Sequence, residues 1–431
     1  MMRKELLGRM FRTAAMIMII SMLAGACSKN NGPEKPEDNT GQTTGPGGNG
    51  SGDQGSSGNE GGSGDEGGNE GGTSGGDHGG SGDSRDQGGS GDSGDQGGSG
   101  GSGDQGDQPK PQITANSWMT AIDDDTKIAL LTIPGTHDAA TSTCAGPGKC
   151  QTLTISGQLE HGVRAFDLRP TMDNNSTLGN IYHSILDTYV SMGDAMEYFD
   201  SFLKTHPGEG IIVIMRYESE RQIFGSIAED NYKTAMKNFL WDSRIYQSRM
   251  AAFNKSMTMK DLRGKILIIS RNDLSPVSTF ETAYTQWSHS NSVGEALQIY
   301  GTGGLGRIYV QDMYSAEKNG NSSEADFLAK KKELVCKLLD ITVPFREYEQ
   351  INWVINYCSG YAGSSFASDS YAKNAASTNP AALEHIKAHT GKGFTGIVMM
   401  DYAGTDTYEV GGSSFNVSGK SLTEELILNN F

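Results

Sequence analysis

Seven short apolar runs recur along residues 112–431 of this chain, and stretches with helical patterns separate them. The runs are Ala129–Ile133, Val163–Leu168, Ile211–Arg216, Lys265–Ser270, Arg307–Gln311, Asn352–Asn356 and Gly396–Met400. They are almost continuously apolar, which is typical of parallel strands that are covered on both faces. Repeated strand–helix units of this kind favour either a closed barrel or a doubly wound open sheet.

Four helical segments are predicted between the runs. One begins at Ser191, because Ser191-Met192-Gly193-Asp194 forms a capping box ahead of an apolar face. The others span about Tyr232–Leu240, Glu324–Leu339 and Pro380–Ala388, the last with Asn379 as its cap and Pro380 in its first turn.

Polar side chains stand at or just beyond the carboxyl ends of the apolar runs. They are His137, Asp138, Asp167, Arg169, Arg216, Arg271, Asp312 and Asp401. In a barrel of parallel strands, these ends converge on one mouth, where active sites are built. We therefore predict an α/β fold, an irregular (β/α)8 TIM-like barrel, with residues 112–431 as a single catalytic domain.

The preceding segment, residues 28–111, has a different composition. It holds 31 of the chain's 59 glycines, 15 acidic residues and 4 basic ones, and almost no apolar side chain. Such a segment cannot bury enough surface to offset its chain entropy, so we predict a disordered, acidic tether.

Of the chain's net charge of −17, residues 112–431 carry −9. An acidic catalytic portion argues against a nucleic-acid partner, which would need a basic surface.

Residues 1–27 read as an export signal. Four basic residues precede an uncharged run from Thr13 to Ala26, which is too short to span a bilayer. The run ends Leu23-Ala24-Gly25-Ala26-Cys27 and resembles a bacterial lipoprotein signal, which implies that Cys27 becomes a lipidated N-terminus. An ordinary secretory signal is the alternative. Under the first interpretation the protein is an exported lipoprotein, anchored at the outer membrane or cell surface, on an outer or a periplasmic face.

Four further cysteines follow. Cys144 and Cys150 stand six residues apart across a Gly-Pro-Gly loop, and Cys336 and Cys358 lie late in the chain. In an exported protein a Cys144–Cys150 disulfide is permitted, and free buried thiols are the alternative. Zinc is disfavoured for these cysteines because no CxxC spacing occurs.

Two histidines with an arginine between them suggest phosphodiester chemistry. His137 follows Ile133-Pro134-Gly135-Thr136, Arg169 follows the segment Arg164–Leu168, and His183 follows Ile181-Tyr182. One imidazole can accept a proton while the other donates one, and the guanidinium can hold the phosphate oxygens. Because this arginine places a fixed positive charge at the phosphate, we predict no metal and no cofactor for the reaction.

An ordered set of segments carries a family resemblance. They are Trp118-Met119, Ile133–Asp138, Arg164–Arg169, Tyr182-His183, Gly210–Arg216, Lys265–Arg271, Gln311–Tyr314 and Met400–Tyr402. Together they resemble the X domain of phosphatidylinositol-specific phospholipase C in its small bacterial form. The resemblance spans nearly all of residues 117–402.

The resemblance implies a lyase that releases diacylglycerol and inositol 1,2-cyclic phosphate from phosphatidylinositol. It implies His137 as the general base, His183 as the general acid and Arg169 as the phosphate ligand. Asp401 would orient His137, and Asp138 would assist His183. The implied partner is phosphatidylinositol, or an inositol-anchored lipid, at a membrane surface, and the protein is expected to be a monomer.

The resemblance also implies an inositol pocket. Arg271 and Asp312 would bind ring hydroxyls, and Tyr314 would lie against the ring face. Arg216 stands in the region where bacterial relatives carry a lysine, and Ser184 stands where a glycine is expected after the second histidine.

Two other functions remain open at this point. One is a metal-dependent glycerophosphodiester phosphodiesterase on a similar barrel, and the other is a non-catalytic, surface-tethered protein that binds inositol lipids or glycans. His385 and His389 have the i, i+4 spacing of a helical metal pair, but no glutamate follows His385 as a zinc protease requires. The spacing is therefore interpreted as coincidence.

Overall fold

The computed structural model describes most of the chain beyond residue 112. The described ranges are 113–144, 146–173, 177–218, 229–276, 282–288, 293–316, 323–389 and 394–431. All of them fall within one compact unit, Gly100–Phe431. The predicted leader with Cys27 and the predicted tether lie outside the described residues.

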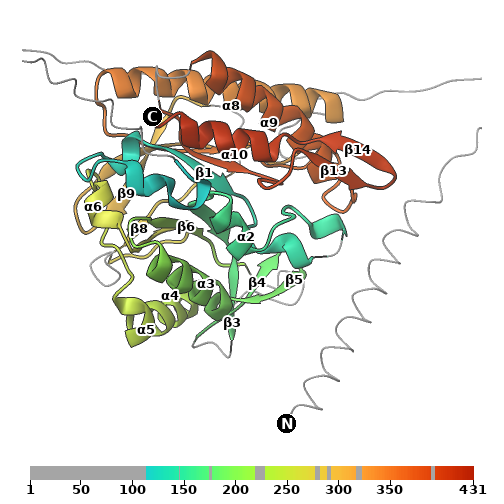
Figure 1. Cartoon of the computed structure of the whole chain (residues 1–431). Helices are drawn as coiled ribbons and strands as arrows, with labels where there is room; N and C mark the ends of the chain where they lie inside the picture. Colours follow the sequence, from blue (N-terminus) through green and yellow to red (C-terminus); the bar gives the residue numbers. More distant parts are fainter. Residues whose placement is uncertain are drawn as a thin grey trace, which may run out of the picture. The chain divides into compact units, whose positions relative to one another are not determined.

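Nine strands form a closed barrel (Figure 1). In chain order they are β1 (Thr132–Thr136), β2 (Ala165–Leu168), β6 (Ile211–Met215), β7 (Ile266–Ser270), β8 (Ala283–Tyr284), β9 (Ala296–Gly301), β10 (Gly306–Gln311), β11 (Trp353–Tyr357) and β12 (Gly396–Met400). The barrel closes where β1 pairs in parallel with both β12 and β2. The predicted irregular barrel is confirmed.

Each of the seven apolar runs overlaps a barrel strand. The first overlaps least, because Ile128–Leu130 forms a short 3-10 turn and β1 begins only at Thr132. The prediction placed that strand three residues too early, since apolar content alone does not separate a buried turn from a buried strand.

Burial on both faces explains why these strands are so apolar. Every residue of β6 is fully buried, and alternate side chains belong to two different clusters. Ile212 and Ile214 lie in the cluster that fills the barrel, whereas Val213 lies in the cluster beneath the outer helices. Burial of a large aliphatic side chain contributes about 1.5–3 kcal/mol, so both layers stabilise the barrel.

One strand makes the barrel irregular. β9 runs antiparallel to both of its neighbours, β8 and β10, while every other barrel pairing is parallel. Neither β8 nor β9 appears among the seven predicted strands. β8 has only two residues, and β9 has a single buried residue, Ile299, so neither forms a continuous apolar run.

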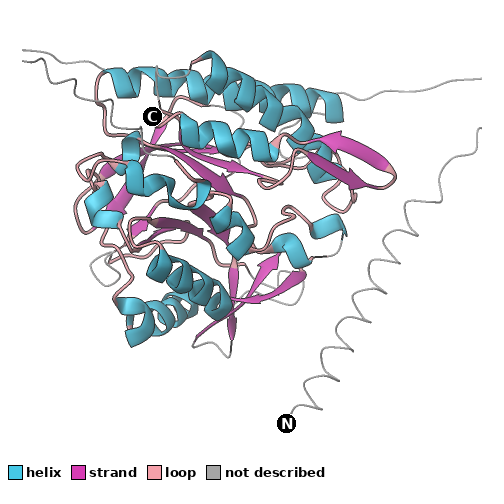
Figure 2. Ribbon diagram, viewed as in Figure 1, coloured by secondary structure: helices cyan, strands magenta, loops and turns pink. Residues whose placement is uncertain are grey.

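Helices surround the barrel (Figure 2). They are α2 (Ile155–Glu160), α3 (Met192–Thr205), α4 (Glu229–Met236), α5 (Arg244–Gln247), α6 (Met259–Leu262), α8 (Glu324–Glu347), α9 (Ser370–Ala388) and α10 (Gly419–Leu428). Short 3-10 turns are η1 (Ala115–Ala121), η2 (Ile128–Leu130), η3 (Thr141–Thr143) and η4 (Gly146–Gly148), and a π turn η5 (Lys237–Trp241) extends α4. In Figure 1, α8, α9 and α10 gather on one side of the barrel and α3, α4 and α5 on the opposite side.

The helix predictions fare unequally. The capping box at Ser191 is confirmed, since its hydroxyl accepts from the Asp194 N–H and the Asp194 carboxylate accepts from the Ser191 N–H. The start predicted at Pro380 is wrong, because α9 begins at Ser370 and Pro380 lies inside it. Asn379 is not a cap. Its buried amide donates to the backbone oxygens of Asp401 and Val417, so it joins the helix to the barrel mouth.

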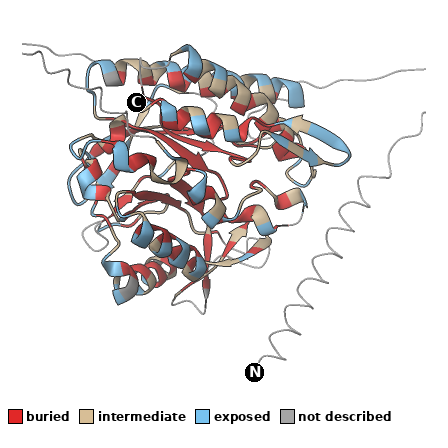
Figure 3. Cartoon of the chain, viewed as in Figure 1, coloured by how far each residue is buried: buried red, intermediate tan, exposed pale blue. Residues whose placement is uncertain are grey.

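Two small sheets lie outside the barrel. One contains β3 (Pro170–Asp173), β4 (Thr177–His183) and β5 (Leu186–Ser191), and the other is the hairpin β13 (Thr407–Val410) and β14 (Ser413–Asn416). Figure 3 shows that exposure concentrates on this hairpin and on the outer faces of the helices, while the barrel strands are buried. In the described part of the chain, no helix has both the length and the apolar character needed to cross a bilayer.

Candidate active site

The carboxyl ends of β1, β2 and β12 bring the predicted polar residues together. Thr136 of β1 pairs with Met400 of β12, so the residues that follow, His137 and Asp401, stand side by side. The buried amide of Gln151 strengthens this junction by donating to the backbone oxygens of His137 and Met400, each at 2.9 Å.

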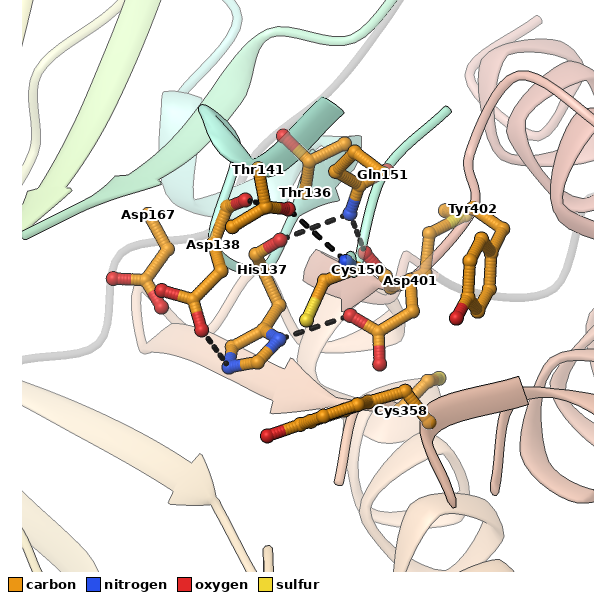
Figure 4. Close-up of polar contacts among 12 residues, drawn as sticks. Thr136, His137, Asp138, Thr141, Cys150, Gln151, Asp167, Cys358, Asp401 and Tyr402 are labelled. Carbon is orange, nitrogen blue, oxygen red and sulfur yellow. Dashed lines mark hydrogen bonds and ion pairs between the residues drawn. The ribbon is translucent and has the colours of Figure 1, made fainter. Parts of the chain in front are cut away.

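His137 lies between two carboxyl groups (Figure 4). Its Nδ1 is 2.9 Å from Oδ1 of Asp401, and its Nε2 is 3.1 Å from Oδ2 of Asp138. Because the carboxyl oxygen of Asp401 accepts, Nδ1 carries the hydrogen and the Nε2 lone pair is left for proton transfer. The predicted pairing of His137 with Asp401 is present in the structure.

Asp138 is the centre of the cluster. Its Oδ1 lies 3.2 Å from Nε of Arg169, and its Oδ2 lies 3.5 Å from Nε2 of His183, in addition to the contact with His137. The residue has a φ of 43°, in the left-handed region that non-glycine residues rarely adopt. This backbone conformation turns the carboxylate toward both imidazoles and the guanidinium.

His183 reaches the site from the end of β4, outside the barrel. Its Nδ1 is 3.0 Å from the Gly148 carbonyl, which can only accept, so Nδ1 carries a hydrogen. Its Nε2 is 3.0 Å from the Tyr371 hydroxyl and faces Asp138. The two imidazole centroids are 6.4 Å apart, with the rings nearly perpendicular.

Burial shapes the protonation of this cluster. Even with two carboxyl groups beside it, His137 has a pKa well below 6.5, because burial and the positive charge of Arg169 both disfavour the imidazolium. Burial raises the pKa of Asp138 to about 6, although Arg169 opposes the shift. Burial, and then the charge of Asp138, raises the pKa of Asp401 well above 3.8. A neutral His137 is the state that a general base requires.

Several polar atoms at the mouth are buried without a hydrogen-bond partner among the described residues. They are Oδ1 of Asp167, Nε of Arg169, Nε of Arg271, the hydroxyl of Tyr357 and Oδ2 of Asp401. Orphaned buried groups are costly, and most folded proteins have few of them. Their gathering around one histidine pair indicates a site prepared for a polar ligand.

A second cluster adjoins the histidine pair. The Trp287 indole N–H donates to Oδ2 of Asp312 at 2.9 Å, and the Arg271 guanidinium donates to the same oxygen at 3.2 Å while lying 4.1 Å from the Trp287 ring centroid. The ring of Tyr357 connects the two clusters, 6.3 Å from the rings of both Trp287 and His137. The structure thus brings Arg271 and Asp312 together, as the sequence predicted.

Arg216 and Tyr314 are less directly connected to this cluster. Arg216 follows β6, and its backbone N–H donates to the Leu168 carbonyl. Within the described residues, its half-buried side chain makes no hydrogen bond or ion pair. The ring of Tyr314 lies 6.4 Å from that of Tyr361, which is 6.1 Å from that of Tyr371 beside His183. Their predicted contacts with an inositol ring stay predictions.

The sequence reasoning missed three residues of this region, Tyr357, Tyr371 and Lys331. Lys331 of α8 is fully buried and donates to Oε1 of Gln311 at 3.1 Å. Its helical spacing from Phe327 and Val335, both buried, places it on the apolar face, and this signal could have identified it. Tyr371 had no such signal, because it lies in the part of α9 that was not predicted to be helical.

The cysteines are free thiols. Cys144, Cys150 and Cys358 are buried and Cys336 is half-buried, so the alternative of reduced thiols holds for all four. Cys150 also brings its sulfur near ligand atoms of His137 and Asp138 (Figure 4). Burial raises the pKa of the Cys150 thiol well above 9, and the Arg169 guanidinium already pairs with Asp138. Both features disfavour a cation at this position.

Comparison with known proteins agrees with the geometry. Residues 135–272 match the family described as "Phosphatidylinositol-specific phospholipase C, X domain". Over these residues the chain is similar to a phosphatidylinositol-specific phospholipase C X domain. The matched residues include His137, Asp138, Arg169 and His183, while Asp401 lies beyond them. The resemblance expected from the sequence is therefore confirmed.

Relatives from two organisms extend the match. The chain is 36% identical over 170 residues to 1-phosphatidylinositol phosphodiesterase of Listeria monocytogenes, covering 38% of this chain and 51%, about half, of that protein. It is 25% identical over 299 residues to the 1-phosphatidylinositol phosphodiesterase of Staphylococcus aureus, covering 67% of this chain and 88% of that protein.

Solved structures show the same fold. A structure of the phosphatidylinositol-specific phospholipase C from S. aureus superposes with a TM-score of 0.58 at 24% identity, covering 74% of this chain and 98% of that one. The corresponding enzyme from L. monocytogenes gives a TM-score of 0.51 at 22% identity, with 74% and 100% coverage. These likenesses establish the barrel fold.

Proposed function

We propose that the chain is a phosphatidylinositol-specific phospholipase C that acts as a lyase. One observation carries the proposal: two imidazoles and a guanidinium meet on a single buried carboxylate, Asp138, at the mouth of an X-domain barrel. The reaction would release diacylglycerol and inositol 1,2-cyclic phosphate.

His137 is the general base in this proposal. Its Nε2 takes the proton from the inositol 2-hydroxyl, whose oxygen then forms a bond to phosphorus. The Nδ1–H donates to Asp401, which holds the ring and stabilises the imidazolium as it forms. The lowered pKa of His137 supports this role, because it keeps the lone pair available at neutral pH.

His183 is the general acid. With Nδ1–H held by the Gly148 carbonyl, the proton that can be given away is the one on Nε2. This proton passes to the diacylglycerol oxygen as the bond between that oxygen and phosphorus breaks. The carboxylate of Asp138 lies 3.5 Å from Nε2, on the side of the ring from which this proton leaves.

Arg169 stabilises the phosphate. At this residue the charges of Asp138 and Asp167 outweigh the effect of burial and raise the pKa of the guanidinium well above its usual value. A guanidinium that is fixed and always charged can hold non-bridging oxygens as charge develops on them. We therefore infer a metal-independent reaction, with Arg271 and Asp312 binding ring hydroxyls of the inositol.

We also propose that the protein is exported and held at a membrane by a lipid on Cys27, and that it acts as a monomer. The leader, the small residues before Cys27 and the glycine-rich tether support the export and the anchor. A long acidic tether would let the barrel reach lipid some distance from its own anchor.

The activity test uses the purified full chain and phosphatidylinositol in detergent micelles, with and without a chelator, and follows water-soluble inositol cyclic phosphate. We expect product in both conditions and a loss of about 10³-fold in His137→Ala. His161→Ala, which changes an exposed histidine bonded to Gly157, is the matched control and should keep full activity. Absence of product in both conditions contradicts the lyase proposal, and loss with chelator alone favours a metal-dependent phosphodiesterase.

The anchor test is metabolic labelling of expressing bacteria with radioactive palmitate. We expect label on the wild-type chain and none on Cys27→Ser. Cys144→Ser removes a buried thiol elsewhere and should keep the label. A labelled Cys27→Ser protein would contradict lipidation at this residue.

A further inference from the structure

Three side chains with metal-binding chemistry meet where α8 and α9 lie together, separate from the catalytic cluster. They are Asp340 of α8, His385 of α9 and His389 at the end of α9. One ligand atom from each lies within 4.8 Å of the other two. From the sequence alone, the spacing of His385 and His389 indicates no site. In the structure, a carboxylate from a second helix lies beside these two histidines.

The distances suit a small cation. Nε2 of His385 lies 3.2 Å from Oδ1 of Asp340. Two ligands on a tetrahedral zinc ion, with bonds of about 2.0–2.2 Å, stand roughly 3.3 Å apart. The imidazoles of His385 and His389 lie along one face of α9, with ring centroids 4.4 Å apart.

The hydrogen bonds leave the ligand atoms available. Nδ1 of His389 is 2.8 Å from the His385 carbonyl, which can only accept, so its Nε2 keeps a lone pair. Metal-binding histidines commonly hold their other N–H in this manner. Nε2 of His385 is buried and has no hydrogen-bond partner among the described residues, even though Asp340 is close. Its contact is the 3.2 Å approach of the Asp340 carboxylate, and a bound cation would join these two atoms.

The surroundings favour a cation that exchanges with solvent. Both histidines lie at the carboxyl end of α9, where the helix dipole attracts positive charge. The side chain of Asp340 is 63% exposed and that of His385 is 15% exposed, so the position is open to solution on one side.

We propose that Asp340, His385 and His389 form a site for a first-row divalent metal ion, with zinc as the best fit to two imidazoles and one carboxylate. Three protein ligands leave at least one coordination position for water, so the ion binds reversibly. It joins the end of α9 to α8 and stabilises their packing. It takes no part in phosphodiester cleavage, so this inference is independent of the proposed function.

Cobalt(II) titration of the chelator-treated full chain tests the site. We expect about one equivalent to bind, with the visible absorption of a low-coordinate Co2+ ion, and zinc to displace it. Bound metal should raise Tm by a few degrees. His385→Ala/His389→Ala should weaken binding roughly tenfold or more, and Asp340→Asn should weaken it less. His161→Ala is the control and should bind like wild type.

Two outcomes would overturn the proposal. One is a wild-type chain that binds no cobalt at micromolar concentration, which leaves only an ion pair between His385 and Asp340. The other is unchanged binding in the double variant, which places the metal elsewhere, for example at His137, Asp138 and Cys150. Circular dichroism establishes that the double variant is folded, and the Co2+ spectrum and Tm remain informative whether or not the chain cleaves phosphatidylinositol.

Discussion

Two arginines flank the same strand, β2, and have opposite surroundings. Arg164 precedes the strand, at the amino end of the barrel, and its guanidinium is paired on all three nitrogens, to Glu209 and to backbone carbonyls that include Leu159 and Asn116. Arg169 follows the strand at the carboxyl end. It donates to Asp167, while its Nε has no aligned partner among the described residues.

The difference separates a structural ion pair from one that lies in the proposed catalytic site. Burial lowers the pKa of Arg164 from its usual value, whereas the charges of Asp138 and Asp167 outweigh burial at Arg169 and raise its pKa. Completed hydrogen bonds at the amino end stabilise the barrel. Incomplete ones at the carboxyl end leave atoms to bind substrate, at a cost in stability.

The largest effect is expected at Arg169. Arg169→Ala should lower kcat/KM for phosphatidylinositol by about 10³-fold, because no other guanidinium contacts Asp138 in the described residues. Tm should change less than in an Arg164 variant, since Asp138 can take up a proton once the positive charge is removed. Arg169→Lys keeps the charge without the planar fork and should recover only part of the activity. Full activity in Arg169→Ala would contradict the proposal that Arg169, unlike Arg164, binds the phosphate of the substrate.

Arg164→Met should show the reverse behaviour. It leaves the Glu209 carboxylate fully buried without its cation, which typically costs about 3–5 kcal/mol of unfolding free energy. Urea denaturation measures this loss, and activity per folded molecule should stay close to wild type. Glu209 still accepts from the backbone and hydroxyl of Thr120, so Arg164→Met/Glu209→Gln should be more stable than the single variant.

Lys331 is a third buried cation to set beside the two arginines. Its charge lies near the site at the carboxyl end, and burying that charge lowers the free energy of unfolding. Burial lowers its pKa from 10.5 to about 8. Between these values the unfolded chain binds more protons than the folded chain, so the penalty is complete below pH 8 and disappears as pH rises toward 10.5. Lys331→Met should therefore raise stability at pH 7 by about 3 kcal/mol, and the gain should shrink as pH approaches 10.

The activity of Lys331→Met should report on His137. Lys331 is one of the charges that lower the pKa of His137, so its removal should raise that pKa and move the acid limb of the kcat/KM profile to higher pH. Lys332→Met changes an exposed neighbour and is the control. Identical acid limbs in both variants and wild type would show that Lys331 has no influence on the base.

The sequence predicted most of the barrel and the part of the site that the barrel strands carry. His137, Arg169 and Asp401 follow short strands that are buried on both faces, and their continuous apolar runs can be located in the sequence. The antiparallel strand β9 was missed because only one of its residues is buried. Tyr371 was missed because its contact with His183 depends on how α9 packs over the mouth, which no local pattern encodes.

Backbone strain also differs between the amino and carboxyl ends of the barrel. Relieving it is the change from which we expect the smallest effect on stability. Gly162, which precedes β2 at the amino end, adopts a left-handed φ of 93°, whereas Ser184, which follows His183, adopts 58° without being glycine. Ser184→Gly should relieve this strain and raise the unfolding free energy by about 1 kcal/mol, measured by urea denaturation. Gly162→Ala should destabilise the fold, because its new Cβ would meet Ile427 and the backbone of Ala115. Since Ser184 adjoins His183, the proposed general acid, a stability gain accompanied by lower kcat would show that strain at the carboxyl end holds His183 in position.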